Sequence, residues 1–512
     1  MSVLGVDVGT TGCKVAAFSA DGRCLAAAYR EYAVVSPSPG LAELDSRRVW
    51  ALIRDALSEV ASACASDPVQ AISSSSMGEA MTPVDADRQI IGNCILMSDP
   101  RGVEYANELR QTLGEEAFYR INRNILGPHY SMPKLRWLQA HQPSLFARAS
   151  CFLLWGDLVA HLLGADATTT YSLANRTLLF DVQRQDWSDQ LLHWAAIPRS
   201  KLGRCVASGQ EIGTLTPSVA AELGLPARVK IISGGHDQCC NALGAGVIHP
   251  GLAVCGLGTY ECITPVFGRL PPEGRLRALG LGAEHHVVPG RYVSFLYNQG
   301  GSLVRWYRDT FAQCERLEGG DVYAVLSAEM PDEPTSLTVL PYFEPSGPPD
   351  FTALAGGAIL GLSTSTRRGE ILRAIIEGVT MYFVKGVRML ADIGVPVHEL
   401  VATGGGTRSN QWLQITADIL AVPVRRPVVT EATVLGAGIL AGVGAGMFAN
   451  QDEGVEVMVR TSVVFHPDSR RASLYRDKVL QAEQIAGFLK PGAVRRDPLG
   501  GGPECRPPLR SA

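Results

Sequence analysis

Two glycine- and threonine-rich turns, one in each half of the 512-residue chain, constrain the fold more than any other sequence feature. The first is Asp7–Gly12 (DVGTTG), which follows the apolar run Val3–Val6, and the second is Gly256–Thr259 (GLGT), which follows Leu252–Cys255. Each pattern predicts a strand, a tight turn and a returning strand. Because glycine has no side chain, backbone N–H groups in such a turn can converge on a phosphate. Two such turns in corresponding places predict one nucleotide held between two related domains.

Length and composition exclude several classes of protein. A chain of 512 residues is too long for one hydrophobic core, so we expect two large domains. The net charge of −4 and the scattered Lys and Arg residues argue against a nucleic-acid partner. No apolar run approaches the roughly 20 residues of a membrane helix, and the chain begins with a strand pattern rather than a leader. We therefore expect a cytoplasmic protein without a membrane partner, whose 12 cysteines are small buried residues.

The first half of the chain predicts strands and helices in a definite order. Residues 3–34 predict three strands in a meander, followed by a helix around 49–57 and a strand over 69–73. The stretch from 101 to 165 has a mostly helical pattern. A further apolar strand leads into Gly234–Gln238 (GGHDQ), where a helix of small residues begins.

The second half repeats this order. From residue 251 the pattern of strand, turn and strand returns, and later a strand over 400–402 leads through three glycines into a helix near Ser409. The repeat predicts domains at 1–245 and 246–490. Residues 491–512, rich in Pro, Gly and Arg and without periodicity, predict a disordered tail.

Taken together, these segments resemble the FGGY family of carbohydrate kinases over nearly the whole chain. The resemblance rests on six motifs, which are Asp7–Thr11 (DVGTT), the stretch Thr168–Ser188, Gly235–Gln238 (GHDQ), Gly256–Thr259 (GLGT), Gly300–Trp306 (GGSLVRW) and Gly404–Ser409 (GGGTRS). Each motif alone is a weak signal, whereas six in the family order are a strong one. The resemblance implies an α/β fold of two actin-like domains with an interdomain cleft. This is the ribonuclease H-like fold that sugar kinases share with Hsp70 and actin ATPases.

The resemblance also implies ATP-dependent phosphoryl transfer to a hydroxyl group of a small sugar, with Asp237 as the general base. Asp237 follows a predicted strand and two glycines, so its carboxylate would project from a rigid turn toward an acceptor hydroxyl. The alternative is an ordinary helix-capping aspartate. Asp7 would face the triphosphate, where Mg²⁺ would offset its charge, and its alternative is a turn-forming residue.

The nucleotide-binding residues that the resemblance implies lie in three glycine-rich segments. They are Thr10, Thr11, Gly12, Lys14, Gly258, Thr259, Gly404, Gly405, Gly406 and Ser409. The first two segments would contact phosphates from opposite domains, and the triple glycine would contact adenosine. The alternatives are an exposed hairpin lysine at position 14, a plain β-turn at 258–259 and a sharp loop at the triple glycine.

The acceptor-binding residues that the resemblance implies follow the strand at 69–73 and the later motifs. They are Met77, Glu79, Asp99, His129, Asp237 and Gln238. Glu79 falls where glycerol kinases carry a substrate-binding Glu, and a carboxylate can bind two polyol hydroxyls. A solvated residue at a strand end is its alternative. Gly78 stands where glycerol kinases have Arg, and Met97 stands where many relatives have Trp. These departures leave the acceptor open among ketoses and polyols of four to six carbons.

We therefore expect ATP, Mg²⁺ and a small sugar or polyol as ligands, and we leave both a homodimer and a monomer open. The alternative function is a catalytically silent sensor of sugar and nucleotide, against which intact Asp7, Asp237 and both phosphate loops speak. An assembly ATPase of the actin or chaperone type would leave the GHDQ motif unexplained.

Overall fold

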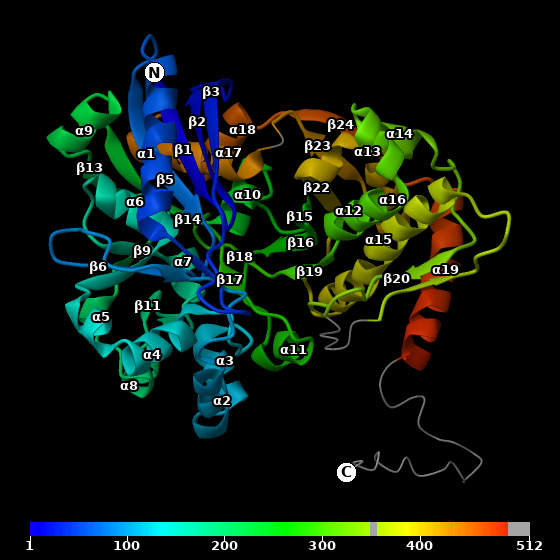
Figure 1. The fold of residues 1–512 in the computed structure, drawn as a ribbon, viewed down its shortest axis with the longest axis horizontal. Coiled ribbons are helices and arrows are strands. Elements are labelled where there is room, and N and C mark those ends of the chain that lie inside the picture. The colour runs from blue at the N-terminus through cyan, green and yellow to red at the C-terminus, as the bar shows by residue number, and fades with distance from the viewer. Residues whose placement is uncertain (349–355, 430, 490–512) are drawn as a thin grey trace, which may run out of the picture.

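Two mixed β-sheets, one in each half of the chain, form the framework of two lobes that lie side by side (Figure 1). The computed structural model describes residues 1–348, 356–429 and 431–489. The expected tail at 491–512 lies outside the described residues. None of the described helices combines the length and the apolar character that crossing a bilayer requires.

The first sheet has the strand order β13-β14-β5-β1-β2-β3. One edge of it is the predicted antiparallel meander of β1 (Ser2–Val8), β2 (Gly12–Ser19) and β3 (Cys24–Glu31), and β13 pairs antiparallel with β14 at the other edge. β5 (Val69–Ser76) pairs parallel with β1, and β14 (Lys230–His236) pairs parallel with β5. The carboxyl ends of β1, β5 and β14 therefore meet at one edge of this sheet.

The second sheet repeats the arrangement at its centre. Its order is β17-β18-β16-β15-β22-β23-β24, with β19 (Leu296–Gln299) pairing with β16. β15 (Leu252–Leu257) pairs antiparallel with β16 (Tyr260–Phe267) and parallel with β22 (Glu399–Thr403), as β1 does with β2 and β5. The predicted duplication of strand, turn and strand is confirmed.

Helices and short strands complete the two lobes. In the first half the helices are α1 (Ser46–Ala63), α2 (Val103–Thr112), α3 (Glu115–Asn122), α4 (Ser131–His141), α5 (Pro143–Arg148), α6 (Trp155–Leu163), α7 (Tyr171–Asn175), α8 (Asp189–Ala195), the 3-10 helix η1 (Arg199–Lys201), α9 (Pro217–Leu223) and α10 (Asp237–Gly244). In the second half they are α11 (Glu273–Ala278), α12 (Gly301–Phe311), α13 (Gln313–Glu318), α14 (Val322–Ala328), α15 (Arg368–Asp392), η2 (Gly405–Arg408), α16 (Asn410–Leu420), α17 (Ala432–Ala445), α18 (Gln451–Met458) and α19 (Ser469–Leu489). The remaining strands are β4 (Glu43–Leu44), β6 (Met81–Val84), β7 (Cys94–Ile95), β8 (Cys151–Leu154), β9 (Thr168–Thr170), β10 (Phe180–Asp181), β11 (Asp186–Trp187), β12 (Arg204–Val206), β13 (Glu211–Thr214), β17 (Glu284–His285), β18 (Tyr292–Val293), β20 (Thr338–Leu340), β21 (Ala358–Leu360), β23 (Val424–Pro427) and β24 (Thr461–Phe465).

Helix α17 belongs to the second half of the sequence but packs on the first sheet, beside β1 and against α10 (Figure 1). Close approach is possible because glycines face backbone atoms. A Cβ on Gly5 would lie 2.1 Å from the carbonyl oxygen of Val434, and a Cβ on Gly436 would lie 1.9 Å from that of Cys240. A buried apolar cluster with members from both halves surrounds this contact. The predicted boundary at residue 245 separates the two sheets in sequence, yet one helix from beyond it covers the first sheet.

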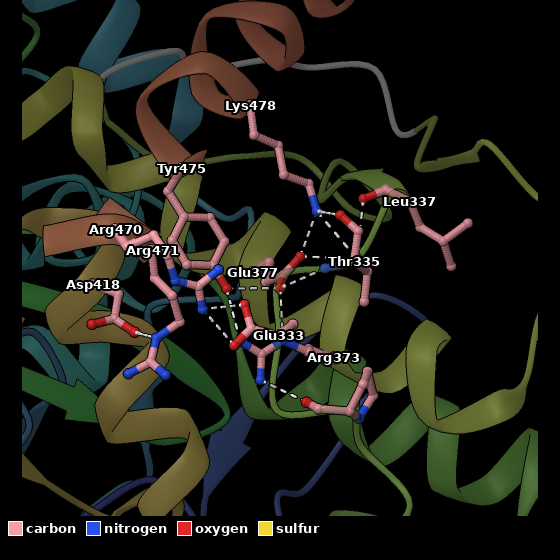
Figure 2. Close-up of polar contacts among 11 residues, drawn as sticks. Glu333, Thr335, Leu337, Arg373, Glu377, Asp418, Arg470, Arg471, Tyr475 and Lys478 are labelled. Carbon is pink, nitrogen blue, oxygen red and sulfur yellow. Dashed lines mark hydrogen bonds and ion pairs between the residues drawn. The ribbon is translucent and has the colours of Figure 1, made fainter. Parts of the chain in front are cut away.

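A buried ionic cluster attaches the last described helix, α19, to α15 (Figure 2). Its centre is Glu377, whose side chain is fully buried. The Glu377 carboxylate accepts hydrogen bonds from Arg373 Nε at 2.9 Å, Tyr475 Oη at 2.8 Å and Thr335 Oγ1 at 2.9 Å, and it pairs with the Lys478 ammonium. Two cations and two hydroxyls thus satisfy one carboxylate, and two of these four groups, Tyr475 and Lys478, lie on α19.

We predict that Glu377→Gln destabilises the protein strongly. The substitution leaves the Arg373 and Lys478 charges buried without their counter-ion, which typically costs about 3–5 kcal/mol. Urea unfolding followed by circular dichroism measures the loss. Glu333→Gln is the matched control, because Glu333 binds Arg470 of the same α19 but both side chains are more than half exposed. Equal unfolding midpoints for Glu377→Gln and Glu333→Gln would contradict this role of the buried cluster.

Candidate active site

The carboxyl ends of β1, β5 and β14 bring together acidic residues that are far apart in sequence. Val8 pairs with Ser76 across β1 and β5, and Ser76 pairs with His236 across β5 and β14. Asp7 therefore lies near the end of β1, and Asp237 is the first residue after β14. Ligands of α/β proteins bind at such carboxyl ends, so the sheet itself builds a candidate active site here.

Asp237 is the first residue of α10 and does not cap it. The residue at the N-cap is His236, and its side chain makes no capping hydrogen bond. The Asp237 carboxylate instead lies 3.2 Å from His236 Nε2, and its side chain is 28% exposed. The helix-capping alternative does not apply in this structure, and the carboxylate is accessible to a ligand.

Burial and neighbouring carboxylates shift the protonation of this site. Burial raises the pKa of Asp237 to about 8, and the negative charges of Asp7 and Glu79 add to the effect. Burial likewise raises the pKa of Asp7 to about 7. By contrast, burial and the Arg176 cation hold the pKa of His236 well below its ordinary value, so this imidazole is neutral at pH 7.

The first glycine-rich turn is a closed loop that presents two hydroxyls to solvent. Gly9 N–H donates to the Gly12 carbonyl at 2.9 Å, and Tyr32 Oη donates to the Gly9 carbonyl at 2.7 Å. The side chains of Thr10 and Thr11 are exposed. Outside the loop, the Lys14 ammonium forms an ion pair with Glu431 at 2.5 Å, so in this structure it has a protein partner rather than a free charge.

The second glycine-rich turn and two residues of the triple glycine, Gly405 and Gly406, line one cavity of about 860 Å³, whereas Gly404 is not among its lining residues. Of the residues predicted to bind nucleotide, the lining contains Gly258, Thr259, Gly405, Gly406 and Ser409. The predicted residues of the first turn do not line it, because every lining residue comes from the second half of the chain. The other lining side chains were not among the predicted nucleotide-binding residues, although Arg305 and Arg408 lie within two of the six motifs. These side chains include Arg305, Asp321, Tyr323, Leu372, Ile376, Arg408, Asn410 and Trp412.

Local geometry explains why glycines stand at this cavity. Gly404 has φ +83°, a conformation that side-chain-bearing residues rarely adopt, and a Cβ there would lie 3.0 Å from the Leu257 carbonyl oxygen. A Cβ on Gly406 would lie 2.7 Å from Leu257 Cβ, whereas one on Gly405 would meet nothing within 4 Å. The Ser409 hydroxyl caps α16 by accepting from Trp412 N–H at 3.2 Å.

On the acceptor side, Glu79 is buried and pairs with Arg176, a residue that the sequence analysis missed. Arg176 follows α7 and also pairs with Glu284 of β17 at 2.6 Å. A Cβ on Gly78 would lie 2.7 Å from Arg176 Cγ, so Arg176 fills the space beside Gly78. Gly78 stands where glycerol kinases have Arg, but here Arg176 brings a guanidinium to Glu79 from another element. The solvated alternative for Glu79 is wrong.

The remaining predicted acceptor residues differ in their surroundings. Both carboxylate oxygens of Asp99 have protein partners, namely the Arg101 guanidinium and Ala42 N–H. Met77 is buried within the apolar core of the first lobe. His129 packs on Tyr130 at 4.1 Å between ring centroids, and burial, with help from Arg176 and Lys134, lowers its pKa to about 3. Gln238 is half-buried beside Asp237.

Comparison with known proteins identifies the family. Residues 2–244 match the model of the N-terminal domain of the FGGY family of carbohydrate kinases, and residues 264–445 match that of its C-terminal domain. The chain belongs to the FGGY family of carbohydrate kinases. FGGY kinases use ATP as a substrate, and their actin-like, two-domain α/β fold is the one predicted from the sequence and seen here.

Xylulose kinases and a glycerol kinase of this family resemble the chain over nearly its full length. The xylulose kinase of Bacillus subtilis is 28% identical over 93% of this chain and 94% of its own. The glycerol kinase of Gloeobacter violaceus is 30% identical over 88% and 90% respectively. Among solved structures, the xylulose kinase of Rhodospirillum rubrum superposes with a TM-score of 0.85 at 28% identity and covers 96% of this chain and 99% of its own.

The surroundings of Asp7 fit the metal ion that the family resemblance implies at this position. Asp7 Oδ1 is buried without a hydrogen-bond partner among the described residues, and a carboxylate oxygen is the kind of ligand that Mg²⁺ prefers. Within the described ranges, no group of three or more His, Cys, Asp or Glu side chains could hold a metal ion. A Mg²⁺ ion at Asp7 would therefore need phosphate oxygens or water to complete its coordination.

We predict that Asp237→Asn stabilises the protein increasingly as pH rises. The folded-state pKa of about 8 lies above the ordinary aspartate value of 3.8, so between these values the folded protein binds more protons than the unfolded chain. The stability that Asp237 contributes is therefore complete below pH 4 and is lost as pH rises through 8. Urea unfolding at pH 5 and pH 8 should show the advantage of Asp237→Asn growing by roughly 2–4 kcal/mol. A difference that is the same at both pH values would contradict this prediction.

Proposed function

We propose that the protein transfers the γ-phosphoryl group of MgATP to a hydroxyl group of a small sugar, a ketose or polyol of four to six carbons, with Asp237 as the general base. One observation carries the assignment of the base. Asp237 stands where three strand ends meet, close enough to Asp7, Glu79 and Arg176 for their charges to act on its carboxylate. A base in this position lies near both the proposed metal ligand and the proposed hydroxyl-binding groups.

In the proposed reaction, Asp237 accepts the proton of the acceptor hydroxyl while the oxygen of that hydroxyl forms a bond to the γ-phosphorus. The bond between the γ-phosphorus and the bridging oxygen breaks, and ADP leaves with that oxygen. A pKa of about 8 suits a base that works near neutral pH, because its conjugate acid holds the proton well. The metal ion, held by Asp7, would neutralise charge on the phosphates.

The two glycine-rich turns would hold the phosphates from opposite sides. The first lobe would bind them through the exposed hydroxyls of Thr10 and Thr11 and the backbone of Gly12. The second lobe would bind them through Gly258 and Thr259. Adenosine would occupy the cavity lined by Gly405, Gly406 and Ser409. Closure of the lobes would then exclude water, so that ATP is not simply hydrolysed.

Turnover with a panel of acceptors tests this proposal. ADP release is followed with MgATP and C3 to C7 ketoses, polyols and aldonates, for the natural protein and Asp237→Ala. We expect one acceptor to stand out, and its turnover to fall by about 10²–10⁴-fold in the variant, while ATP binding measured by calorimetry stays unchanged. Binding of ATP and sugar without turnover by the natural protein would instead support the silent sensor. ADP release independent of any acceptor would contradict both.

We predict that Gly405→Val weakens ATP binding without unfolding the protein. A side chain at this position meets no protein atom within 4 Å, so it would project into the space that adenosine should fill. The KM for ATP should rise about 10-fold with little change in kcat, as expected when a ground-state contact is blocked. Gly274→Val is the matched control, because a Cβ there also meets nothing but lies outside the cavity lining. An unchanged KM for ATP in Gly405→Val would contradict the proposal that adenosine occupies this cavity.

Location and assembly complete the proposal. We propose a cytoplasmic enzyme whose partners are ATP and the acceptor, with neither nucleic acid nor membrane involved. Sedimentation equilibrium distinguishes the homodimer from the monomer.

A further inference from the structure

Arg176 is enclosed by groups from distant parts of the chain. Its two terminal nitrogens bind Glu79, 97 residues earlier, and Glu284, 108 residues later. The exposed side-chain fractions of Arg176, Glu79 and Glu284 are 11%, 6% and 1%. The guanidinium carbon lies 4.9 Å from the ring centroid of Tyr130 and 5.9 Å from that of Phe295. Both terminal nitrogens of this cation are therefore occupied, and aromatic rings lie against it.

Several polar atoms around this group lack partners. Arg176 Nε, Glu284 Oε2 and His236 Nδ1 are buried without a hydrogen bond among the described residues. Glu284 Oε2 and His236 Nδ1 lie 4.0 Å apart, and the other nitrogen of His236 lies 3.2 Å from Asp237. Buried polar groups are normally satisfied, so these three atoms call for a partner that the described residues do not supply, such as a water molecule or a ligand. Here such atoms lie beside the proposed base.

We propose that Arg176, Glu79 and Glu284 form the acceptor-recognition site, and that this charged triad selects an uncharged polyhydroxyl acceptor over an anionic one. The inference deepens the proposed function and rests on it. An acceptor hydroxyl can donate to Glu284 Oε2 and accept from Arg176 Nε–H, so donor and acceptor atoms are offered together, as neighbouring hydroxyls require. Arg176 and Glu284 are in this way specificity-determining residues, while Asp237 performs the proton transfer.

The charge balance of the triad argues against aldonates and sugar phosphates. Arg176 carries one positive charge and the two glutamates carry two negative charges, which leaves the group with a net charge of −1. Asp7 and Asp237 stand at the same end of the sheet and add no cation. Arginine binds a carboxylate best through two parallel N–H groups, yet both terminal nitrogens of Arg176 are already taken by glutamates. An anionic acceptor would therefore meet net negative charge, and Nε is the one guanidinium nitrogen of Arg176 that no carboxylate of the described residues binds.

Glu284→Gln tests the proposal, because it removes one charge, keeps the side-chain shape and leaves the Arg176–Glu79 pair intact. The acceptor is the polyol with the highest turnover in the panel, measured beside the aldonate of the same configuration, for example D-arabinitol and D-arabinonate. We expect the KM for the polyol to rise about 10-fold or more, since a hydrogen bond to a charged group is lost. The ratio of polyol to aldonate kcat/KM should fall about 5-fold or more, since a repulsive charge is removed.

Glu273→Gln is the matched control. Glu273 binds Arg123 at 2.9 Å and attaches the same segment of the second half to α3, but it lies outside the triad. We expect its KM values and its polyol-to-aldonate ratio to equal those of the natural protein. Calorimetric titration of each variant with ADP confirms that the nucleotide site is intact.

The outcomes separate this inference from the proposed function. If none of the acceptors in the panel causes the natural protein to release ADP, the proposed function fails. If it phosphorylates a polyol or ketose and Glu284→Gln leaves both the KM and the ratio unchanged, the triad does not recognise the acceptor and the inference is wrong. A natural protein that prefers the aldonate over its matched polyol also overturns the inference, while leaving the kinase intact.

Discussion

The parallel pairing of β1, β5 and β14 is the constraint on which the candidate active site depends. Parallel strands end at the same edge of a sheet, and here the three strands are followed or ended by Asp7, Glu79 and Asp237. The sheet thereby forces carboxylates from three separate segments into one place. Burial raises the pKa of both Asp7 and Asp237, and the charges of Asp7 and Glu79 raise the pKa of Asp237 further. Lys14, whose positive charge lowers the pKa of Asp7, and Arg176, which pairs with Glu79, offset part of the cost of gathering these carboxylates.

Much of the framework could be predicted because it is encoded locally. The meander at the start of the chain, the strand before Asp237 and the return of the pattern after residue 251 all follow from apolar runs of strand length bounded by glycine turns. The place of Asp237 at a strand end followed by a helix was predicted for the same reason. The family resemblance assigned both Gly258 and the triple glycine to the nucleotide, and in the structure Gly258, Gly405 and Gly406 line one cavity.

The parts that could not be predicted depend on long-range contacts. No residue near Arg176 in the sequence indicates that Arg176 binds Glu79 and Glu284. The signal that could have identified Arg176 is that it is one charged residue within an otherwise uncharged stretch. Asp99 fits a family motif, yet its carboxylate is fully engaged by Arg101 and Ala42. Met77 follows the strand as expected, but its side chain packs into the core. Whether a side chain faces a cleft or the interior depends on neighbours that are distant in sequence.

The segment around Glu284 belongs to the second half of the sequence but is attached to the first lobe, so the lobes do not follow the order of the sequence. Tyr119 Oη donates to the Leu281 carbonyl at 2.9 Å, and Ala283 N–H donates to the Arg123 carbonyl at 2.9 Å, so this piece of the second half is attached to the first lobe. A chimaera that joins the first 245 residues of this protein to the second half of a relative would therefore inherit Glu79, Arg176 and Asp237 but take position 284 from the other parent. Acceptor preference in this architecture is a property of both parents, and exchanging halves at the apparent boundary mixes two recognition sites rather than transferring one.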